Sequence, residues 1–256
     1  MIDPRAIVDP GAELAAGVEV GPFAIVGAGV VVGEGSSIGA HAQITGPALI
    51  GRDNRIYPFA SIGCDPQDKK YRGEETRLEI GDGNVIREYC TISRGTGDGG
   101  GVTRIGDHNW IMAYVHVAHD CLVGSHTIFA NSASLAGHVE VEDWVILGGF
   151  TLVHQFCRIG AHAFTGMGSA INMDVPPYVT VSGQPASPHG INGEGLKRRG
   201  FTPDAVRHIR RAYKILYKSG LRLEEARARI TEMAAEVPEL EPLARFLERD
   251  GRGILR

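Results

Sequence analysis

Four histidines, His116, His119, His138 and His154, lie close together in the middle of the chain, and an aspartate, Asp120, follows the second of them. A neutral imidazole changes its charge near neutral pH and can take a proton from a hydroxyl group. Three imidazoles and a water can instead hold a catalytic zinc ion. Histidines can also simply pack on a surface. The fold must show whether these side chains meet.

A six-residue repeat dominates the first two thirds of the sequence. Counting from Ile2 in steps of six, every position to Ile62 is aliphatic. The repeat breaks after residue 63, resumes from Ile80 to Ile92, breaks again at 97–101, and runs from Ile105 to Ile171 with only Thr165 not hydrophobic. This period fits neither an α-helix nor a simple strand, but it is the hexapeptide period of a parallel β-helix.

The predicted fold is therefore an all-β solenoid over residues 1–177, with loop insertions near 64–79 and 97–104. Each hexad forms a short strand and a turn, and three hexads close one coil of about 18 residues. Coils stack about 4.8 Å apart. We expect the aliphatic residue and the small residue at the fifth position to point inward, and the frequent glycine after the aliphatic residue to ease the corner.

The repeat ends near Pro176–Pro177, and residues 178–256 are predicted to form a C-terminal α-helical domain. Helices are expected over 203–218, roughly 222–236 and roughly 240–249. Pro203 suits the first turn of the first helix, and Gly220 suits its end. Its apolar face comprises Ala205, Ile209, Ala212, Tyr213, Leu216 and Tyr217.

Stacked coils convert a separation of 18 residues into vertical neighbours. Two adjacent columns then contain His119, Gly137 and Gln155, and Asp120, His138 and Phe156. Their members should lie within roughly 10 Å. In such a cluster His119 could act as a base oriented by Asp120, and the Gly137 N–H could hold an oxyanion. A zinc site and packed surface histidines remain alternatives at this point.

Composition narrows the class of protein. The net charge of −4 argues against a nucleic-acid binder. No apolar run long enough for a transmembrane helix and no signal peptide is apparent, so we expect a cytoplasmic protein without a membrane span. Four cysteines without a CxxC motif predict neither a zinc site nor a disulfide. Cys121 and Cys157 are expected to be small core fillers.

Several motifs distributed over the whole chain are highly specific. They are His116-Val117-Ala118-His119-Asp120-Cys121, Leu135-Ala136-Gly137-His138-Val139, His154-Gln155-Phe156-Cys157, Gln67-Asp68-Lys69-Lys70-Tyr71, Arg94-Gly95-Thr96, Asp174-Val175-Pro176-Pro177-Tyr178 and Glu194-Gly195-Leu196-Lys197-Arg198-Arg199-Gly200-Phe201. With these motifs the sequence closely resembles the UDP-N-acetylglucosamine 3-O-acyltransferases, hexapeptide-repeat enzymes that begin lipid A biosynthesis.

The resemblance implies a left-handed β-helix, a homotrimer with active sites between neighbouring β-helices, and no cofactor or metal. It implies transfer of a 3-hydroxyacyl chain from acyl carrier protein to the sugar of UDP-N-acetylglucosamine. His119 matches the catalytic base, Asp120 the residue that orients it, and Gly137 the oxyanion glycine.

The resemblance also assigns substrate-binding residues. His116, His138 and Gln155 match residues of the sugar-nucleotide and acyl pocket, and His154 lies in the adjacent column. Asp68 and Lys70 match acceptor-binding residues. The nucleotide side is matched by Asn192, Glu194, Arg198 and Arg199.

Two positions depart from the family pattern. Ser93 stands where better-known members carry histidine near the acceptor sugar, which leads us to expect altered acceptor preference, including a 3-amino sugar. Met167 stands in a coil where the family limits the acyl groove, and a methionine there predicts a donor nearer ten than fourteen carbons (an estimate of about four heavy atoms).

A cluster of basic residues in the C-terminal part of the sequence is a candidate binding surface for the acyl donor. Between Lys197 and Arg222 lie nine basic residues and a single acidic one, Asp204, a net charge of +8. Acyl carrier protein is small and acidic, so a basic helix face can steer it electrostatically.

Overall fold

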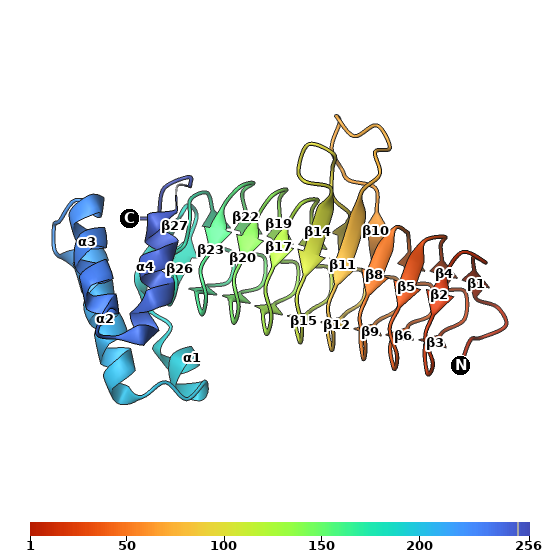
Figure 1. The fold of residues 1–256 in the computed structure, drawn as a ribbon, viewed down its shortest axis with the longest axis horizontal. Coiled ribbons are helices and arrows are strands. Elements are labelled where there is room, and N and C mark those ends of the chain that lie inside the picture. Colours follow the sequence, from red (N-terminus) through yellow and green to blue (C-terminus); the bar gives the residue numbers. More distant parts are fainter. Residues whose placement is uncertain (250) are drawn as a thin grey trace.

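The computed structural model describes residues 1–249 and 251–256 and shows a long prism with a cluster of helices at one end (Figure 1). Three parallel sheets form its walls. The first wall contains β1 (Ile7–Val8), β4 (Ile25–Val26), β7 (Gln43–Ile44), β10 (Ser61–Cys64), β13 (Thr91–Ser93), β16 (His116–Val117), β19 (Ser134–Leu135), β22 (Leu152–Val153) and β25 (Ala170–Ile171). The second contains β2 (Glu13–Leu14), β5 (Val30–Val32), β8 (Ala48–Ile50), β11 (Arg77–Ile80), β14 (Val102–Ile105), β17 (Leu122–Val123), β20 (Glu140–Val141) and β23 (Arg158–Ile159).

The third wall contains β3 (Glu19–Val20), β6 (Ser37–Ile38), β9 (Arg55–Ile56), β12 (Val85–Ile86), β15 (Trp110–Ile111), β18 (Ile128–Phe129), β21 (Ile146–Leu147), β24 (Phe164–Thr165), β26 (Val179–Gly183) and β27 (Ala186–Ile191). We call the turns from first to second wall the first corner, from second to third the second corner, and from third to first the third corner. Where no insertion intervenes, strands pair in parallel with a register of 18 residues, as in Val117 with Leu135. The predicted stacking is confirmed.

The aliphatic residue of each hexad points inward as predicted. Ile44, Ile62 and Phe129 are completely buried, and this continuous aliphatic column forms the core of the prism. Thr165, the exception in the repeat, is buried as well, and its hydroxyl lies 2.7 Å from that of Thr151. A paired hydroxyl can replace an aliphatic side chain there because its hydrogen-bonding capacity is met inside the coil.

The corners are built differently from our expectation for glycine. The left-handed backbone falls on the third residue after the aliphatic one, which is often not glycine: φ is 59° at Asp120, 62° at His138 and 64° at Phe156. The glycine directly after the aliphatic residue serves close approach between coils instead. A Cβ at Gly33 would lie 2.6 Å from the carbonyl carbon of Gly51. The expectation that this glycine eases the corner is wrong, because the left-handed conformation falls on a different residue and the glycine instead makes room for the next coil.

The two insertions leave the first corner and project from the prism together (Figure 1). One follows β10 and the other follows β13. Arg94 ties them to the corner: it pairs with Asp65, donates to the Tyr71 hydroxyl at 2.9 Å and donates to the carbonyl of Gly63 at 2.9 Å. The insertions therefore stand beside the corner that carries His119.

The C-terminal segment begins with a strand hairpin rather than a helix. β26 pairs in parallel with β24, and β27 returns antiparallel to it. The third wall thus extends past the predicted boundary at residue 177. A short helix α1 (Gly193–Arg198), which the sequence did not suggest, follows the hairpin.

The three predicted helices are confirmed as α2 (Pro203–Lys218), α3 (Leu223–Ala234) and α4 (Glu241–Glu248), with a 3-10 turn η1 (Pro238–Leu240) before α4. Thr202 caps α2 by accepting from the N–H of Ala205, and Gly220 takes a positive φ of 73° after its end. The predicted apolar face of α2 is buried apart from the half-buried Tyr217. None of the helices in the described part of the chain has both the length and the apolar character needed to cross a membrane.

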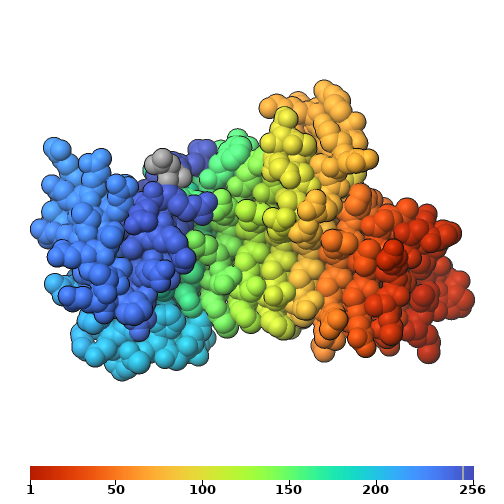
Figure 2. All heavy atoms as spheres, in the orientation of Figure 1, coloured from red at the N-terminus to blue at the C-terminus, as the bar shows by residue number. Residues whose placement is uncertain are grey.

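The C-terminal tail is attached to the last coils next to a buried ion pair. Arg158 donates from Nε to Asp174 at 2.9 Å, and both side chains are buried. The main chain of Asp174 also bonds to the C-terminal tail, through its N–H to Gly253 and its carbonyl to Leu255. In the space-filling view the helices cover one end of the prism, while the walls between them and the N-terminus stay open on this side (Figure 2).

Candidate active site

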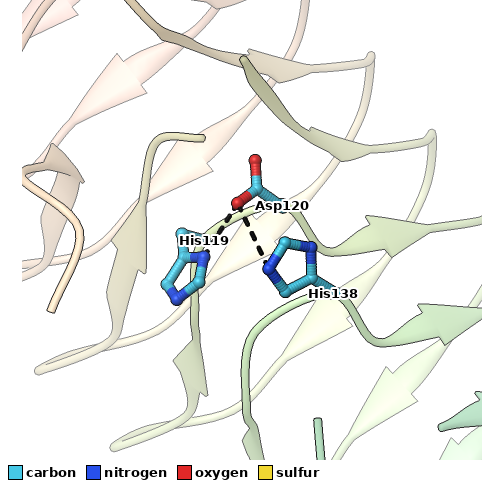
Figure 3. Close-up of side chains that lie close together, drawn as sticks. All are labelled: His119, Asp120 and His138. Carbon is cyan, nitrogen blue, oxygen red and sulfur yellow. Dashed lines mark hydrogen bonds and ion pairs between the residues drawn. The ribbon is translucent and has the colours of Figure 1, made fainter. Parts of the chain in front are cut away.

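The first corner holds a histidine–aspartate pair (Figure 3). Val117 ends β16, and the turn to β17 places His119 and Asp120 next to each other. Nδ1 of His119 lies 2.8 Å from Oδ2 of Asp120. The carboxylate accepts this bond, so Nδ1 carries the proton and Nε2 is left with its lone pair. A histidine in this tautomer is ready to accept a proton.

Asp120 is held rigidly on its other sides. Its Oδ1 accepts from the N–H of Thr96 at 2.9 Å, and its Oδ2 accepts from the Thr96 hydroxyl at 2.6 Å. Its own N–H donates to the Thr103 hydroxyl at 2.8 Å. The side chain is 1% exposed. These bonds compensate for burying a charged carboxylate.

Gly137 lies one coil further along the same corner. A Cβ there would lie 2.6 Å from Cε1 and 2.8 Å from Nε2 of His119. The glycine therefore leaves space for the imidazole. In the described part of the chain, no acceptor takes a hydrogen bond from the Gly137 N–H, so this donor is available to an incoming group.

Two further histidines flank the pair. His138 lies edge-on to His119, with ring centroids 5.1 Å apart, and its Nε2 is 3.8 Å from Oδ2 of Asp120. Burial lowers the pKa of His138, although the charges of Asp120 and Asp68 act in the opposite direction. Burial also lowers the pKa of His116, whose Nδ1 lies 2.7 Å from the Thr91 hydroxyl. Both imidazoles are thereby biased toward the neutral form.

A groove of about 450 Å³ runs along the outside of the first wall beside this corner. It is lined by Gln67, His116, Ala118, His119, Ser134, Leu135, Ala136, Gly137, Leu152, Val153 and Gln155. His119 and Gly137 therefore line the same groove as apolar side chains, among them Leu152, which is 55% exposed. His119, Gly137 and Gln155, which were predicted to form one column, all line this groove, so the column prediction is confirmed.

His119, Asp120 and His138 each bring a potential metal-ligand atom within 4.8 Å of the other two. The carboxylate oxygen nearest the histidines already accepts from His119 and from Thr96. A metal at this point would have to replace both bonds. The donor set therefore fits a hydrogen-bonded catalytic pair better than a zinc site.

The insertions bring some predicted residues near the groove. Asp68 accepts a bond from the N–H of Lys70 at 2.9 Å, which defines a turn in the first insertion. The same insertion contributes Gln67 to the groove. The charge of Asp68 acts to raise the pKa of His138, against the larger effect of burial, which lowers it.

Three predicted residues do not line this groove within one chain. Ser93 is completely buried, 3.7 Å from the Cys64 sulfur, so its side chain does not reach the groove surface. His154 lines a neighbouring hollow of about 340 Å³ with Ala170 and Pro185 rather than the groove of His119. Met167 stands on the third corner and is 81% exposed, so it fills no groove within one chain.

The residues expected on the nucleotide side gather at the second corner. Asn192 caps α1 and donates to the carbonyl of His162 at 3.0 Å. Arg199 lies over the Trp144 ring, 5.1 Å from its centroid. Glu194 pairs with Lys197 at 2.7 Å, and Arg198 belongs to the same helix. Within one chain, this group and His119 occupy different corners of the prism.

Thr96 and Gln67 are functional candidates that stand in family motifs but received no role from the sequence. Both lie in insertions, where the register of 18 no longer predicts neighbours. Thr96 lies 24 residues before Asp120 in the chain, yet contacts it directly. The Arg94-Gly95-Thr96 segment contains no pattern that predicts this contact.

Comparison with known proteins places these features in a family. The six-repeat bacterial transferase hexapeptide model matches residues 11–46 and 103–137, and the model for domain 2 of Udp N-acetylglucosamine O-acyltransferase matches 174–255. An acyl-[acyl-carrier-protein]–UDP-N-acetylglucosamine O-acyltransferase of Alkalilimnicola ehrlichii is 62% identical, over 100% of this chain and 99% of that protein. The chain belongs to the UDP-N-acetylglucosamine O-acyltransferase family.

Solved structures support the same placement. The UDP-N-acetylglucosamine acyltransferase of Francisella novicida is 46% identical, with a TM-score of 0.98 over 100% of this chain and 94% of that one. LpxA from Acinetobacter baumannii is 46% identical, with a TM-score of 0.97 over 100% and 99%. The chain is an acyltransferase with a left-handed β-helix of hexapeptide repeats and C-terminal helices, which confirms the predicted fold and enzyme class.

Proposed function

We propose that this chain transfers a 3-hydroxyacyl group from acyl carrier protein to the 3-position of UDP-N-acetylglucosamine or its 3-amino analogue, beginning lipid A biosynthesis in the cytoplasm. The observation that carries the proposal is the 2.8 Å contact between Nδ1 of His119 and Asp120, which leaves Nε2 unprotonated in a groove. Its relatives are named as acyl-[acyl-carrier-protein]–UDP-N-acetylglucosamine O-acyltransferases, which supports both substrates.

The proposed reaction is a direct transfer. Nε2 of His119 removes the proton from the acceptor hydroxyl, and the acceptor oxygen attacks the thioester carbonyl. The Gly137 N–H stabilises the oxyanion that forms on that carbonyl. The carbon–sulfur bond then breaks, and His119 returns the proton to the departing thiolate of the carrier. Asp120 holds the imidazole in position and stabilises its positive charge.

The cysteines do not favour a covalent acyl-enzyme. Cys121 is completely buried, and burial raises the pKa of its thiol to about 12. Burial likewise raises the pKa values of Cys90 and Cys157 to about 11. A thiol acts as a nucleophile through its thiolate, so these groups are inert. These three buried cysteines therefore support direct attack by the acceptor.

The acceptor preference is a separate part of the proposal. Ser93 is a small buried residue at a position where histidine is expected. Ser93 lies beneath the surface of the first corner, so we propose that it affects acceptor preference indirectly, through the residues packed against it. We propose that this favours a 3-amino sugar nucleotide over the 3-hydroxyl compound.

We propose a homotrimer because the functional groups of one chain are divided. His119 lies on the first corner, whereas Arg199 lies on the second and Met167 on the third. A neighbouring copy can bring Met167 against the groove, where it would shorten the acyl chain that fits. His154 is assigned to the same acyl region, since its hollow adjoins Leu152 and Val153, which also line the groove.

Acyl carrier protein is proposed to dock on α2. Arg210, Arg211 and Lys214 are exposed on this helix. Within the described residues none of them forms an ion pair. Their charge is thus available to an acidic carrier.

The test is a mass-spectrometric assay with carrier proteins loaded with 3-hydroxyacyl chains of several lengths, against both acceptors. We expect acylated sugar nucleotide with wild type, a preference near ten carbons, faster turnover of the 3-amino acceptor, and no effect of a metal chelator. Equal or better turnover of the 3-hydroxyl acceptor would refute the acceptor proposal. Absence of product from every pair would refute the function.

A further inference from the structure

The second insertion hydrogen-bonds to the catalytic pair through Thr96. This residue is 5% exposed and precedes the glycine-rich stretch of the insertion. Its N–H donates to Oδ1 of Asp120 at 2.9 Å, and its hydroxyl lies 2.6 Å from Oδ2. One residue therefore binds both oxygens of the carboxylate.

The Thr96 hydroxyl has two partners. Its oxygen accepts from the N–H of Gly99 at 3.2 Å. Its proton is donated to Oδ2 of Asp120. That same oxygen accepts the proton on Nδ1 of His119.

The insertion also covers the carboxylate. A Cβ at Gly99 would overlap the carboxyl group of Asp120. The carbonyl of Thr96 accepts from the N–H groups of Gly99 and Gly101, which closes the loop into a compact turn. Only glycine at 99 permits this close approach, so the turn takes the place of water against Asp120.

We propose that Thr96 is a positioning residue for the transfer reaction, acting through Asp120 on the orientation and tautomer of His119. The inference rests on the proposed role of His119. A carboxylate held by two donors from one residue cannot rotate away from the imidazole. Hydrogen bonds from the Thr96 hydroxyl and from Nδ1 of His119 together stabilise the negative charge on Oδ2. Hydrogen bonds to a charged group are among the stronger ones.

The test uses Thr96→Val, which keeps the shape and the main-chain bond but removes the hydroxyl. We expect kcat to fall about tenfold to a hundredfold, with KM for the sugar nucleotide within about twofold of wild type. Thr96→Ser should recover most of the loss, because serine restores the donor. Thr76→Val is the matched control: Thr76 is also buried near an insertion, but among the described residues its hydroxyl has no partner.

A double-mutant comparison separates positioning from general stability. In an Asp120→Ala background, Thr96→Val should change the residual rate by less than about twofold, because its target is gone. Wild-type kcat in Thr96→Val would overturn the inference. So would a full additional loss in the Asp120→Ala background, or failure of serine to restore activity. His119→Ala tests the proposed function separately: if it loses activity while Thr96→Val does not, only the inference about Thr96 fails.

Discussion

The imidazole of His119 occupies the space that a side chain at Gly137 would need. The two residues lie one coil apart on the first corner, and a Cβ at Gly137 would stand 2.8 Å from Nε2 of His119. This close approach brings the proposed base and the proposed oxyanion donor to the same end of the groove. It also makes the glycine necessary for a reason independent of backbone conformation.

Gly137→Ala should therefore reduce activity without unfolding the protein. The added methyl group must displace the imidazole, so we expect kcat to fall about a hundredfold. Gly149→Ala is the matched control, because Gly149 occupies the same place in its hexad and a Cβ there meets only an ordinary contact 3.4 Å from Asn131. Steady-state kinetics and thermal melting check both variants. A fully active Gly137→Ala enzyme would contradict the close packing.

Stability should fall as the solution is acidified below neutrality. Burial, aided by the charge of Arg199, lowers the pKa of His162 from 6.5 to about 4, and Asp143 opposes this. Below pH 6.5 the unfolded chain binds a proton that the folded state resists, so folding loses stability from about pH 6.5 down to about pH 4. His116 and His138 shift in the same direction.

His162→Phe keeps the ring between Trp144 and Tyr178 but removes the titrating group. Denaturant unfolding at pH 7 and pH 5 should show a smaller loss of stability in this variant than in wild type. His189→Gln, on an exposed histidine, serves as control and should leave the pH dependence unchanged. An identical slope for His162→Phe and wild type would argue against the assignment.

Met167→Gly should lengthen the preferred acyl chain. Met167 is 81% exposed in the single chain, so its removal should cost little stability. Competition between ten- and fourteen-carbon 3-hydroxyacyl donors, read by mass spectrometry, checks the change. If wild type already prefers the fourteen-carbon donor, the methionine does not limit the groove.

Reversing charge on α2 should weaken capture of acyl carrier protein. Arg210→Glu with Arg211→Glu should raise KM for the acylated carrier about tenfold at low salt, and the difference should shrink as salt screens the surface. The matched control is Arg227→Glu with Arg229→Glu on α3, which are also exposed. Equal effects of both pairs, or no effect of salt, would count against docking on α2.

The sequence predicted the solenoid and the catalytic corner because both follow from one period. Val117 and Leu135 are 18 apart and pair directly, which brings His119 and Gly137 together. The same period also separates Met167 from His119, since Met167 belongs to a different corner. A match to a family motif does not show whether two residues meet within one chain or across the boundary between two chains.

The remaining features depend on local contacts that no period encodes. Thr96 reaches Asp120 across an insertion, where the strand register is 25 residues instead of 18, as in Ile92 with Val117. Ser93 turns inward because it ends β13 directly before that insertion, where its neighbour is Cys64 rather than the groove. The hairpin of β26 and β27 replaces the coil when Pro176 and Pro177 end the repeat.

The most direct test of the account is the rate of acyl transfer by His119→Ala with saturating donor and acceptor. The contact between Nδ1 of His119 and Asp120 predicts that Nε2 supplies the base, so kcat should fall about a hundredfold to ten-thousandfold while the variant melts like wild type. A folded His119→Ala enzyme with a rate within a few-fold of wild type would contradict the central claim.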